Sequence, residues 1–447
     1  TPMSAYRAVR KLPPAHTLVL EDGQPRLNRY WQLDYASKLD LSPAELGERI
    51  RAELQAAVRR RLVADVPLGA FLSGGIDSSA VVAAMAEASS GPVKTFSIGF
   101  EDERFDELEH ARLIAERFGT DHTEFVVRPD GIELLPKLVR HYGEPFADSS
   151  AIPCFKLAEL TRRHVTVALN GDGGDESFAG YMRYAGNVLG QRFERLPTPL
   201  RRAGSALGRR LPARGEMDST LSRVRRLALA AELDAPSRYA RSHACFDPAA
   251  RDALYTPEFA ALVGESSADE VIAGPWREAS GSAPVDVMLE VDVRTYLPGD
   301  LLTKIDIATM AHSLEARSPF LDPSLMQLAA SIPASLKLRG REKKVVLRDA
   351  LRGWIPDSIL DRPKQGFSVP LAGWLRGSLS GYAEELLLEG KARSRGWFEP
   401  ETVRGLLERH GRGEDHSNRI WSLIVLETWM REVVESPGRA EPAVLAA

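Results

Sequence analysis

The sequence predicts an α/β fold: a twisted parallel sheet with helices on both faces, followed by a largely helical carboxyl-terminal part. Between residues 66 and 169, short apolar runs of strand character alternate with helical stretches, which is typical of crossover connections between parallel strands. Two of these runs are followed by glycine-rich segments, at the positions where loops of a parallel sheet carry ligand sites. From residue 295 onward, apolar residues recur at helical spacing.

The first expected element is a hairpin. Residues 16–31 contain two apolar runs around an Asp22-Gly23 pair, which is a strong signal for a tight turn between antiparallel strands. Because a lone hairpin is marginally stable in water, we expect this one to pack on another domain.

A helix with a clear start follows the hairpin. Ser42 is expected to be its N-cap, Pro43 to occupy its first turn, and Glu45 to close a capping box. Apolar residues at every fourth position predict the buried face of this helix: Leu46, Ile50, Leu54, Val58 and Leu62.

The sheet is expected to contain four strands, at residues 66–72, 94–100, 122–127 and 164–169. The segments between them predict helices at 79–88, 106–118, 130–141 and 151–163. Residues 187–290 have a less regular pattern of helices and loops. In the carboxyl-terminal part, helices are expected at 295–316, 341–354 and 417–434.

Composition excludes several classes of protein. The chain has 447 residues, enough for two or three domains, with 44% hydrophobic and 27% charged residues and a formal net charge of −4. This weak acidity offers no overall attraction to nucleic acid or anionic lipid, and no apolar run reaches the roughly 18 residues needed to cross a bilayer. Two cysteines, Cys154 and Cys245, do not suggest a disulfide framework, and we interpret both as small buried hydrophobic residues of a cytoplasmic protein.

The first motif that carries chemistry is SGGIDSS at residues 73–79, after an expected strand and before an expected helix. Gly74 and Gly75 allow the backbone to approach an anion closely, and the amino terminus of the helix adds partial positive charge. Asp77 would repel a phosphate unless a Mg²⁺ ion bridges the two. A serine-capped turn is the simpler interpretation, but the full string after a buried strand favours a phosphate site.

Two common nucleotide-binding motifs are missing from the sequence. There is no G-x-x-x-x-G-K-[ST], which disfavours an enzyme that transfers the γ-phosphate. There is also no G-x-G-x-x-G after a strand, which disfavours a dinucleotide-binding fold.

The second motif is NGDGGDE at residues 170–176, again after an expected strand. Clustered acids repel one another and are tolerated where a cation lies among them. If the two strands are neighbours, Asp175 can face Asp77 across one Mg²⁺ ion, and an ordinary polar turn is the alternative.

The third motif places Lys343 and Lys344 at the start of an expected helix, where cations are unfavourable for the helix dipole. A nearby anion would explain them, and a lysine here could stabilise a departing pyrophosphate. A solvated surface helix is the alternative.

Together these segments resemble a known family. SGGIDSS resembles the pyrophosphate-binding loop of the ATP-pyrophosphatase superfamily. Residues 37–440 resemble the synthetase domain of glutamine-dependent asparagine synthetase in five blocks: VPLGAFLSGGIDSS, TFSIGF, LNGDGGDESFAGY, SLEARSPFLD, and KKVVLRDAL with RPKQGFSVPLAGWL. The resemblance implies an adenine nucleotide alpha hydrolase-like fold.

The resemblance also implies roles for individual residues. Asp172 and Lys344 are the implied catalytic residues, and Asp77 and Asp175 are the implied magnesium ligands. Asn170 departs from the serine of the family, although its amide can still donate a hydrogen bond. The implied ATP-binding residues are Leu72, Ser73, Gly74, Gly75, Asp77, Ser78, Ser79, Ile98, Asn170 and Gly171.

The reaction implied by the resemblance has two steps. The β-carboxylate of aspartate attacks the α-phosphorus of ATP, giving β-aspartyl-AMP and pyrophosphate, and ammonia then displaces AMP to leave asparagine. The implied substrates are ATP with Mg²⁺, aspartate, and ammonia or glutamine, in a cytoplasmic enzyme that could form a homodimer. No nucleic-acid or membrane partner is expected.

The resemblance divides the chain into three parts. Residues 1–36 resemble the end of the family's amino-terminal glutaminase domain, residues 37–440 its synthetase domain, and residues 441–447 a tail. Thr1 is not the cysteine nucleophile of such a glutaminase, so we expect a fragment of a longer product that uses free ammonia instead of glutamine.

Three alternatives remain open on the sequence alone. Relatives that close lactams or amidate sugars and peptides share the nucleotide loops, and the acyl pocket that separates them is expected to include residues 144–153. The arginine-rich segment 192–226 suggests RNA binding as a second alternative. Phe193 is the single aromatic residue of this segment, whereas surfaces that stack on bases need several. The third alternative is a non-catalytic scaffold protein. The presence of both aspartates, Asp77 and Asp175, and of Lys344 argues against it.

Overall fold

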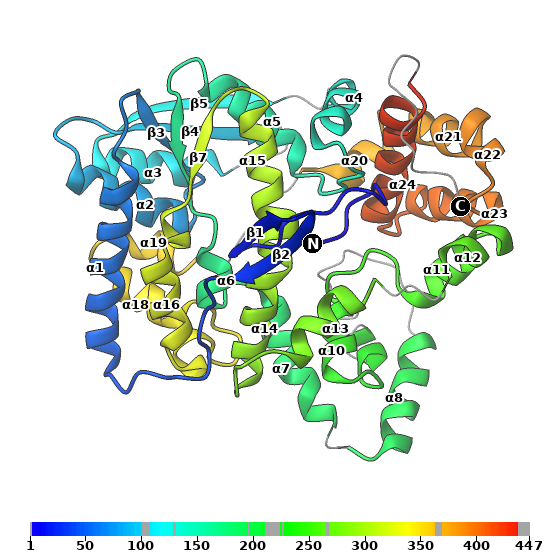
Figure 1. The fold of residues 1–447 in the computed structure, drawn as a ribbon, viewed down its shortest axis with the longest axis horizontal. Coiled ribbons are helices and arrows are strands. Elements are labelled where there is room, and N and C mark those ends of the chain that lie inside the picture. Colours follow the sequence, from blue (N-terminus) through cyan, green and yellow to red (C-terminus); the bar gives the residue numbers. More distant parts are fainter. Residues whose placement is uncertain are drawn as a thin grey trace. The chain divides into compact units, whose positions relative to one another are not determined.

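The computed structural model of the chain describes residues 2–100, 107–127, 131–194, 196–210, 224–225, 228–264, 268–362 and 369–436. The chain divides into two compact units, whose elements are labelled in Figure 1. The first, here called the sheet unit, contains Thr1–Arg128, Ser150–Tyr184 and Glu278–Ser368. The second, the helical unit, contains Pro129–Ser149, Ala185–Arg277 and Val369–Ala447.

A five-stranded parallel sheet in the described residues forms the centre of the sheet unit, with the strand order β5-β4-β3-β6-β7. Its strands are β3 (Leu68–Phe71), β4 (Lys94–Phe100), β5 (Asp121–Val127), β6 (Val167–Leu169) and β7 (Glu315–Arg317). The strand order reverses at β3, which has β4 on one side and β6 on the other. In open parallel sheets, ligand sites form at the carboxyl ends of the strands beside such a reversal. The predicted α/β class is confirmed.

Two strands differ from the prediction. The strand expected at 164–169 begins only at Val167, because the N–H groups of His164 and Val165 donate to the carbonyl oxygen of Thr161 and close the preceding helix. The prediction also places Glu315 and Ala316 in a helix, whereas they belong to β7 with Arg317. These residues carry no apolar run, and they are a strand because they pair with β6, which local sequence does not show.

Helices cover both faces of the sheet (Figure 1). On one face, Glu124 of β5 accepts hydrogen bonds from Arg112 of α3 (Leu108–Phe118). On the other face, Phe125 of β5 and Phe96 of β4 lie near His164, just after α5 (Ala151–Thr161). Glu124 and Phe125 are adjacent, and adjacent residues of a strand point to opposite faces, so the two helices lie on opposite sides.

Other helices of the sheet unit surround these layers. The stretch predicted as one helix at 295–316 is instead a π-helical turn at Leu297–Leu301, a helix and then β7. The further helices are α1 (Pro43–Arg61), α2 (Ile76–Ala88), α6 (Gly174–Phe178), α14 (Pro284–Arg294), α15 (Leu302–Met310), α16 (Pro323–Ser331), α17 (Ala334–Lys337), α18 (Val345–Leu351) and α19 (Asp357–Leu360), with a 3₁₀ turn at Pro319–Leu321.

Helix α1 begins as predicted. The Ser42 hydroxyl accepts a hydrogen bond from the Glu45 N–H, and the Glu45 carboxylate accepts one from the Ser42 N–H. Pro43 is the first helical residue. Four of the five residues predicted on its apolar face are buried, and Leu62 is half-buried just beyond the last turn. This face packs against α2, α16 and α18 in the core of the sheet unit.

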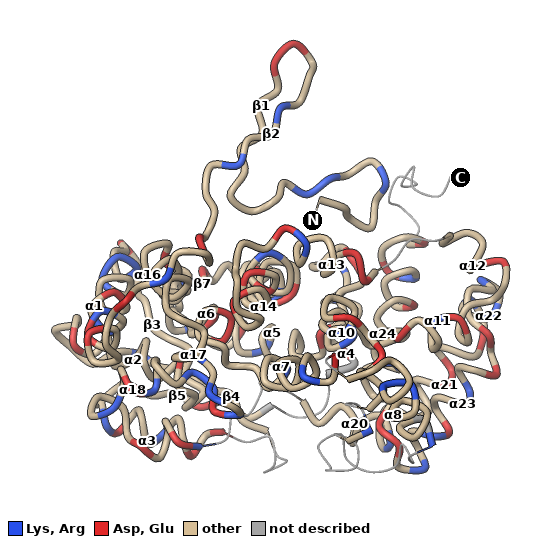
Figure 2. Tube along the Cα trace, turned by 90° about the horizontal axis from the view of Figure 1, so that it is seen from below, with Lys and Arg blue, Asp and Glu red and all other residues tan. Residues whose placement is uncertain are grey.

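The predicted hairpin is formed by β1 (His16–Glu21) and β2 (Gln24–Arg29), with Asp22 and Gly23 at positive φ in its turn. It extends away from the helices of the sheet unit in Figure 2. Both strands are largely exposed, including three leucines: Leu18, Leu20 and Leu27. That another domain covers this hairpin stays a prediction.

The helical unit contains the helix predicted at 417–434, observed as α24 (Ser417–Trp429) and a π-helical turn at Met430–Val434. The irregular region 187–290 also resolves into short helices. The other helices are α4 (Gly131–Tyr142), α7 (Met182–Glu194, which begins in the sheet unit), α8 (Thr198–Arg210), α10 (Ala235–Arg241), α11 (Pro248–Leu254), α12 (Pro257–Val263), α13 (Glu270–Arg277), α20 (Leu371–Arg376), α21 (Ser380–Leu388), α22 (Gly390–Arg395) and α23 (Pro400–Gly411). Among the described residues, none of these helices is long and apolar enough to cross a membrane.

The two cysteines lie in different environments. Cys154 is buried in α5, as predicted. Cys245 is exposed, so the prediction that it is buried is wrong. It lies in the turn between α10 and α11, where no periodic apolar pattern indicates whether a side chain points inward.

The arginine-rich segment is only partly described. Arg201, Arg202 and Arg210 lie on α8, while residues 211–223 and Arg226 lie outside the described residues. The expectation that the chain binds no nucleic acid therefore stays a prediction.

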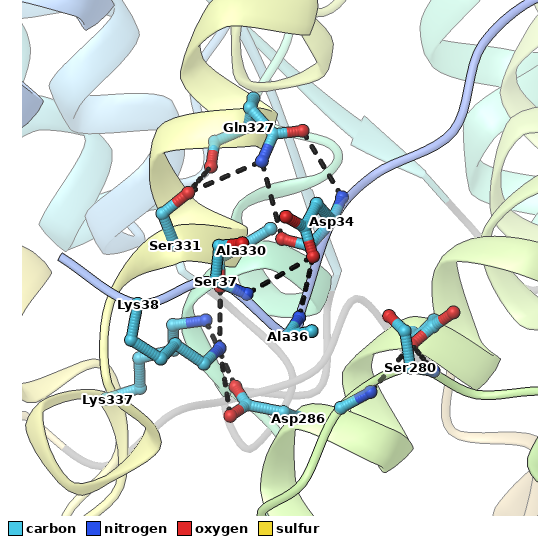
Figure 3. A network of polar contacts seen from close by, with 12 residues as sticks. Asp34, Ala36, Ser37, Lys38, Ser280, Asp286, Gln327, Ala330, Ser331 and Lys337 are labelled. Atoms are coloured by element: carbon cyan, nitrogen blue, oxygen red, sulfur yellow. Dashed lines mark hydrogen bonds and ion pairs between the residues drawn. The ribbon is translucent and has the colours of Figure 1, made fainter.

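A buried charge cluster joins the segment before α1 to α14, α16 and α17 (Figure 3). Lys38 Nζ donates to the carbonyl oxygen of Ala330 at 2.7 Å and lies 2.9 Å from Asp286 Oδ2. Lys337, whose side chain is 0% exposed, lies 3.7 Å from Asp286 Oδ1. Both ammonium groups lie over the ring of Tyr35. Burial lowers the pKa of Lys337 to about 7, and Asp286 opposes this effect only in part.

This lowered pKa predicts a pH-dependent effect of replacing Lys337. The ordinary pKa of lysine is 10.5, so between about pH 7 and that value the unfolded chain binds a proton that the folded chain does not. The contribution of Lys337 to stability therefore rises with pH through this window and is least favourable at and below pH 7. Lys337→Met removes the cost of burying this ammonium group and leaves Asp286 paired with Lys38, so it should raise the free energy of unfolding by about 1–4 kcal/mol near pH 6.5, and the gain should shrink toward pH 10.

Urea denaturation at several pH values measures this effect. Lys391→Met, on a side chain that is 58% exposed, is the control and should change stability by less than about 0.5 kcal/mol at every pH. A Lys337→Met protein that is less stable than the wild type near pH 6.5 would show that the ammonium group supports the fold.

Candidate active site

Two loops at the carboxyl ends of neighbouring strands form the candidate active site. The SGGIDSS loop follows β3, and the NGDGGDE loop follows β6, which pairs with β3. The loops touch, since a Cβ added to Gly171 would lie 2.8 Å from the Cβ of Asp77 and 2.8 Å from the nitrogen of Ser78. The condition set by the sequence, that the two strands are neighbours, is met.

Asp77 and Asp175 both contact one ammonium group. Lys344 Nζ lies 2.7 Å from Asp175 Oδ1 and donates a hydrogen bond to Asp77 Oδ2. The side chains are mostly buried, with 5% of Lys344, 17% of Asp77 and 14% of Asp175 exposed. Burial alone would lower the pKa of Lys344, but the carboxylates of Asp175 and Asp77 outweigh burial and hold this pKa above its ordinary value. Lys344 is therefore a cation at neutral pH.

Lys344 does not lie inside a helix, although the sequence predicts one over residues 341–354. Arg339 and Glu342 form an isolated bridge, and α18 begins only at Val345. Lys344 is the N-cap, with a φ of 52° in the left-handed region that residues with a side chain rarely adopt. The ion pairs with two carboxylates offset this strain and the unfavourable position of a cation beside the helix amino terminus.

Two glycines leave room for the three charged groups. A Cβ on Gly174 would lie 2.3 Å from Asp77 Oδ1. A Cβ on Gly180 would lie 1.7 Å from Asp175 Oδ1 and 2.4 Å from Lys344 Cε. The wall around the charges is therefore backbone, which has little freedom to move aside.

The SGGIDSS loop holds its shape through its own hydrogen bonds. The Gly75 N–H donates to the Ser73 hydroxyl at 3.3 Å, and the Ser78 hydroxyl donates to the Gly75 carbonyl oxygen at 3.2 Å. Gly74 has a φ of 68°, and a Cβ there would lie 2.5 Å from the backbone of His110. Helix α2 begins directly after Gly75, so its amino-terminal N–H groups lie at the loop, an arrangement suited to an anion.

Three other predicted ATP-binding residues lie deeper than the loop surface. Leu72 follows β3, Ile98 lies on the neighbouring β4, and Ser79 lies in the first turn of α2. Their exposed fractions are 1%, 8% and 0%, respectively. Their contact with a nucleotide stays a prediction.

The NGDGGDE loop is held by Asn170. The side-chain amide of Asn170 donates to Asp172 Oδ2 at 2.9 Å, and its oxygen accepts from the Asp172 N–H at 3.3 Å. That oxygen also accepts from the Ser318 hydroxyl, and the Asn170 N–H donates to the carbonyl oxygen of Arg317 at 2.9 Å. Asparagine at this position thus joins the predicted catalytic Asp172 to β7.

An aromatic cage, which the sequence analysis missed, follows the second loop. The guanidinium carbon of Arg183 lies 3.9 Å from the ring centroid of Tyr181 and 4.4 Å from that of Tyr296. Arg183 Nη2 lies 2.7 Å from Asp292 Oδ2, which accepts a hydrogen bond from the Tyr184 hydroxyl at 2.6 Å. The sequence signal was the YMRY run at residues 181–184, separated by four residues from the end of NGDGGDE, and the cage anchors the turn beside the paired carboxylates.

The segment predicted to line an acyl pocket, residues 144–153, is divided between the two units. In the sheet unit, the Ser150 hydroxyl accepts a hydrogen bond from Lys304 Nζ at 2.8 Å. The role of this segment stays a prediction.

The residues at the paired carboxylates fit a magnesium ion. Carboxylate oxygens are its preferred protein ligands, and Asp77 and Asp175 contact a common cation across a narrow backbone cradle. No group of three or more His, Cys, Asp or Glu side chains in the described residues could hold a metal. A magnesium ion here would therefore need further oxygen ligands from a bound phosphate or from water.

Comparison with known proteins identifies the family. The family model for asparagine synthase matches residues 49–431. The chain belongs to the asparagine synthase family. The resemblance read from the sequence motifs is confirmed.

Individual relatives of this family match nearly the whole chain. A Mycobacterium bovis protein, named provisionally as a glutamine-hydrolysing asparagine synthetase, is 35% identical over 445 residues, which cover 97% of this chain and 66% of that protein. Glutamine-hydrolysing asparagine synthetase 1 of Bacillus subtilis is 31% identical over 427 residues, covering 94% of this chain and 65% of that protein. Amidase chyE of Penicillium rubens is 26% identical over 445 residues, covering 90% and 65%. The chain spans just under two thirds of the length of these curated relatives.

The backbone cradle predicts that Gly180→Ala disrupts the site. Its methyl group would overlap Asp175 Oδ1 and Lys344 Cε, so we expect a loss of at least about 1–3 kcal/mol in the free energy of unfolding, measured by urea denaturation. Gly186→Ala is the matched control, because no atom lies within 4 Å of a Cβ on this α7 residue. It should be neutral or stabilise by up to about 1 kcal/mol. Equal stability of the two variants would contradict the crowding described here.

Proposed function

We propose that this chain catalyses ATP-dependent amide formation by adenylating a carboxylate, and that the carboxylate is the side chain of aspartate. The observation that supports this most directly is the meeting of Asp77, Asp175 and Lys344 at the carboxyl ends of β3 and β6. Membership of the asparagine synthase family supports ATP-dependent amide formation in general. The proposed product is asparagine.

In the proposed first step, ATP activates the acyl group. A carboxylate is a poor acyl donor because its leaving group would be oxide. A β-carboxylate oxygen of aspartate attacks the α-phosphorus of ATP, and the bond from that phosphorus to the bridging oxygen of the β-phosphate breaks. The products are β-aspartyl-AMP and pyrophosphate. Most of the catalysis lies in positioning the two reactants and neutralising their charge.

The residues of the two loops divide this work. The backbone of Ser73–Ser79 and the amino terminus of α2 bind the phosphates that leave. Lys344 stabilises the negative charge that develops on pyrophosphate. Asp77 and Asp175 would hold Mg²⁺, which would neutralise phosphate charge when bound. Asp172, positioned by Asn170, acts in forming the acyl-adenylate.

In the proposed second step, ammonia attacks the acyl carbon and AMP leaves. The nitrogen then loses a proton, which gives the neutral amide. Glutamine is the proposed nitrogen source in a longer protein of this family, and ammonia is the one for this chain. The proposal also places the enzyme in the cytoplasm, as a homodimer.

A second candidate function keeps adenylation and changes the acyl group. The match to the fungal proteins named amidase chyE and amidase chry2, both 26% identical, favours considering it. The nucleotide loops do not choose the acyl group, because specificity lies in the pocket that binds it.

Release of pyrophosphate from ATP with a panel of carboxylic acids distinguishes the two candidates. We expect aspartate with ammonium to give the highest rate and to yield asparagine, detected by chromatography. Turnover with another carboxylate and none with aspartate would replace the proposed substrate. Pyrophosphate release with no acid at all would overturn the proposal.

Removal of one carboxylate tests the paired site directly. Asp175→Asn should lower kcat for pyrophosphate release by at least about 100-fold, because it removes a charge that pairs with Lys344 and that would bind the metal. Asp349→Asn, on an exposed position of α18, is the control and should keep kcat within about twofold. A similar kcat for both variants would exclude Asp175 from the reaction.

A further inference from the structure

We propose that Lys344 and a divalent cation are alternative occupants of the space between Asp77 and Asp175, and that bound nucleotide switches one for the other. The metal would bind the two carboxylates when the ammonium group of Lys344 moves to form an ion pair with a phosphate of the nucleotide. The inference rests on the proposed function, because the metal is expected here as the partner of ATP.

The first argument is that both cations would use the same two carboxylates. Lys344 Nζ lies 2.7 Å from Asp175 Oδ1 and donates to Asp77 Oδ2, so it already bridges the two carboxylates. A magnesium ion bound by the same carboxylates would lie at about 2.0–2.1 Å from their oxygens. Two cations held by the same pair of mostly buried carboxylates would be close neighbours with little water between them, and a monovalent and a divalent charge repel strongly in such surroundings.

The second argument is the wall of the site. Gly174 and Gly180 place backbone against Asp77, Asp175 and the Lys344 side chain, and even a single methyl group there would overlap them. The carboxylates therefore cannot shift toward this backbone to make room for a second cation on that side. Entry of a metal requires the ammonium group to leave.

The third argument is the destination of the ammonium group. Lys344 is 4% exposed, and a buried ammonium without an anion is strongly unfavourable. The Lys344 ammonium group can therefore leave the two carboxylates only if another anion lies close by. Asp77 belongs to the SGGIDSS loop, whose N–H groups and helix terminus suit a phosphate, so a bound nucleotide supplies that anion beside the lysine.

This exchange makes metal binding depend on nucleotide. Without nucleotide, Lys344 competes with the metal and weakens its binding. With nucleotide, the competition is removed, so the two ligands bind with positive coupling that passes through Lys344. Without this side chain, the metal should bind the carboxylates directly.

The test measures Mn²⁺ binding to the nucleotide-free chain by electron paramagnetic resonance of the free ion. Lys344→Met should bind Mn²⁺ at least about tenfold more tightly than the wild type. Lys343→Met removes the same charge one residue earlier and should stay within about twofold of the wild type. Equal affinities of Lys344→Met and Lys343→Met would overturn the proposal, because the effect would then be general electrostatics.

Folding provides a second readout. Lys344→Met leaves two buried carboxylates without their cation, so its melting is followed by circular dichroism with and without Mn²⁺. If the variant does not fold alone, the proposal requires Mn²⁺ to restore a cooperative transition, and failure at every Mn²⁺ concentration overturns it. Pyrophosphate release by the wild type tests the proposed function separately, since its absence would leave the Mn²⁺ result standing.

Discussion

The balance between one ammonium group and two carboxylates is the constraint around which the sheet unit is arranged. Lys344, Asp77 and Asp175 are mostly buried, and each would be unfavourable there without the others. Their meeting requires two strands to be neighbours, glycines where the charges contact backbone, and a left-handed residue at the start of α18. A change in any of these features separates the charges.

The parallel sheet explains how residues so distant in sequence converge. β3 and β6 are neighbours although two strands lie between them in the chain, and both loops leave the same edge of the sheet. β7 and the Arg183–Asp292 pair then support the second loop from later parts of the chain. The geometry of the candidate site is thus a property of the sheet order, and the helices around it hold that order in place.

Lys337 and Lys344 are both buried in the described part of the sheet unit, but their pKa values shift in opposite directions. Lys344 contacts two carboxylates, and they raise its pKa against the effect of burial. Lys337 shares a single carboxylate, Asp286, with Lys38, so burial prevails and its pKa falls to about 7. The number of anions per buried cation decides the outcome. Lys344 therefore stays charged and is suited to binding phosphate, whereas the charged form of Lys337 is unfavourable in the folded protein.

Much of the molecule followed from local patterns. The capping box at Ser42, the turn at Asp22-Gly23 and the apolar face of α1 are short-range signals, because the interacting groups lie within a few residues of each other. The two glycine-rich loops were found in the same way, as was the family. The prediction for Cys245 was wrong because an isolated residue in a turn carries no such pattern.

The sequence by itself determined many of the helices and strands and which residue types line the two loops, because those depend on side-chain chemistry and spacing along the chain. The tertiary structure decided that β7 exists, that Lys344 precedes its helix and bridges two carboxylates, and that Arg183 is caged beside them. Each of these depends on a partner more than 100 residues away, as β6 to β7 and Asp77 to Lys344 illustrate, and no local pattern encodes such a pairing.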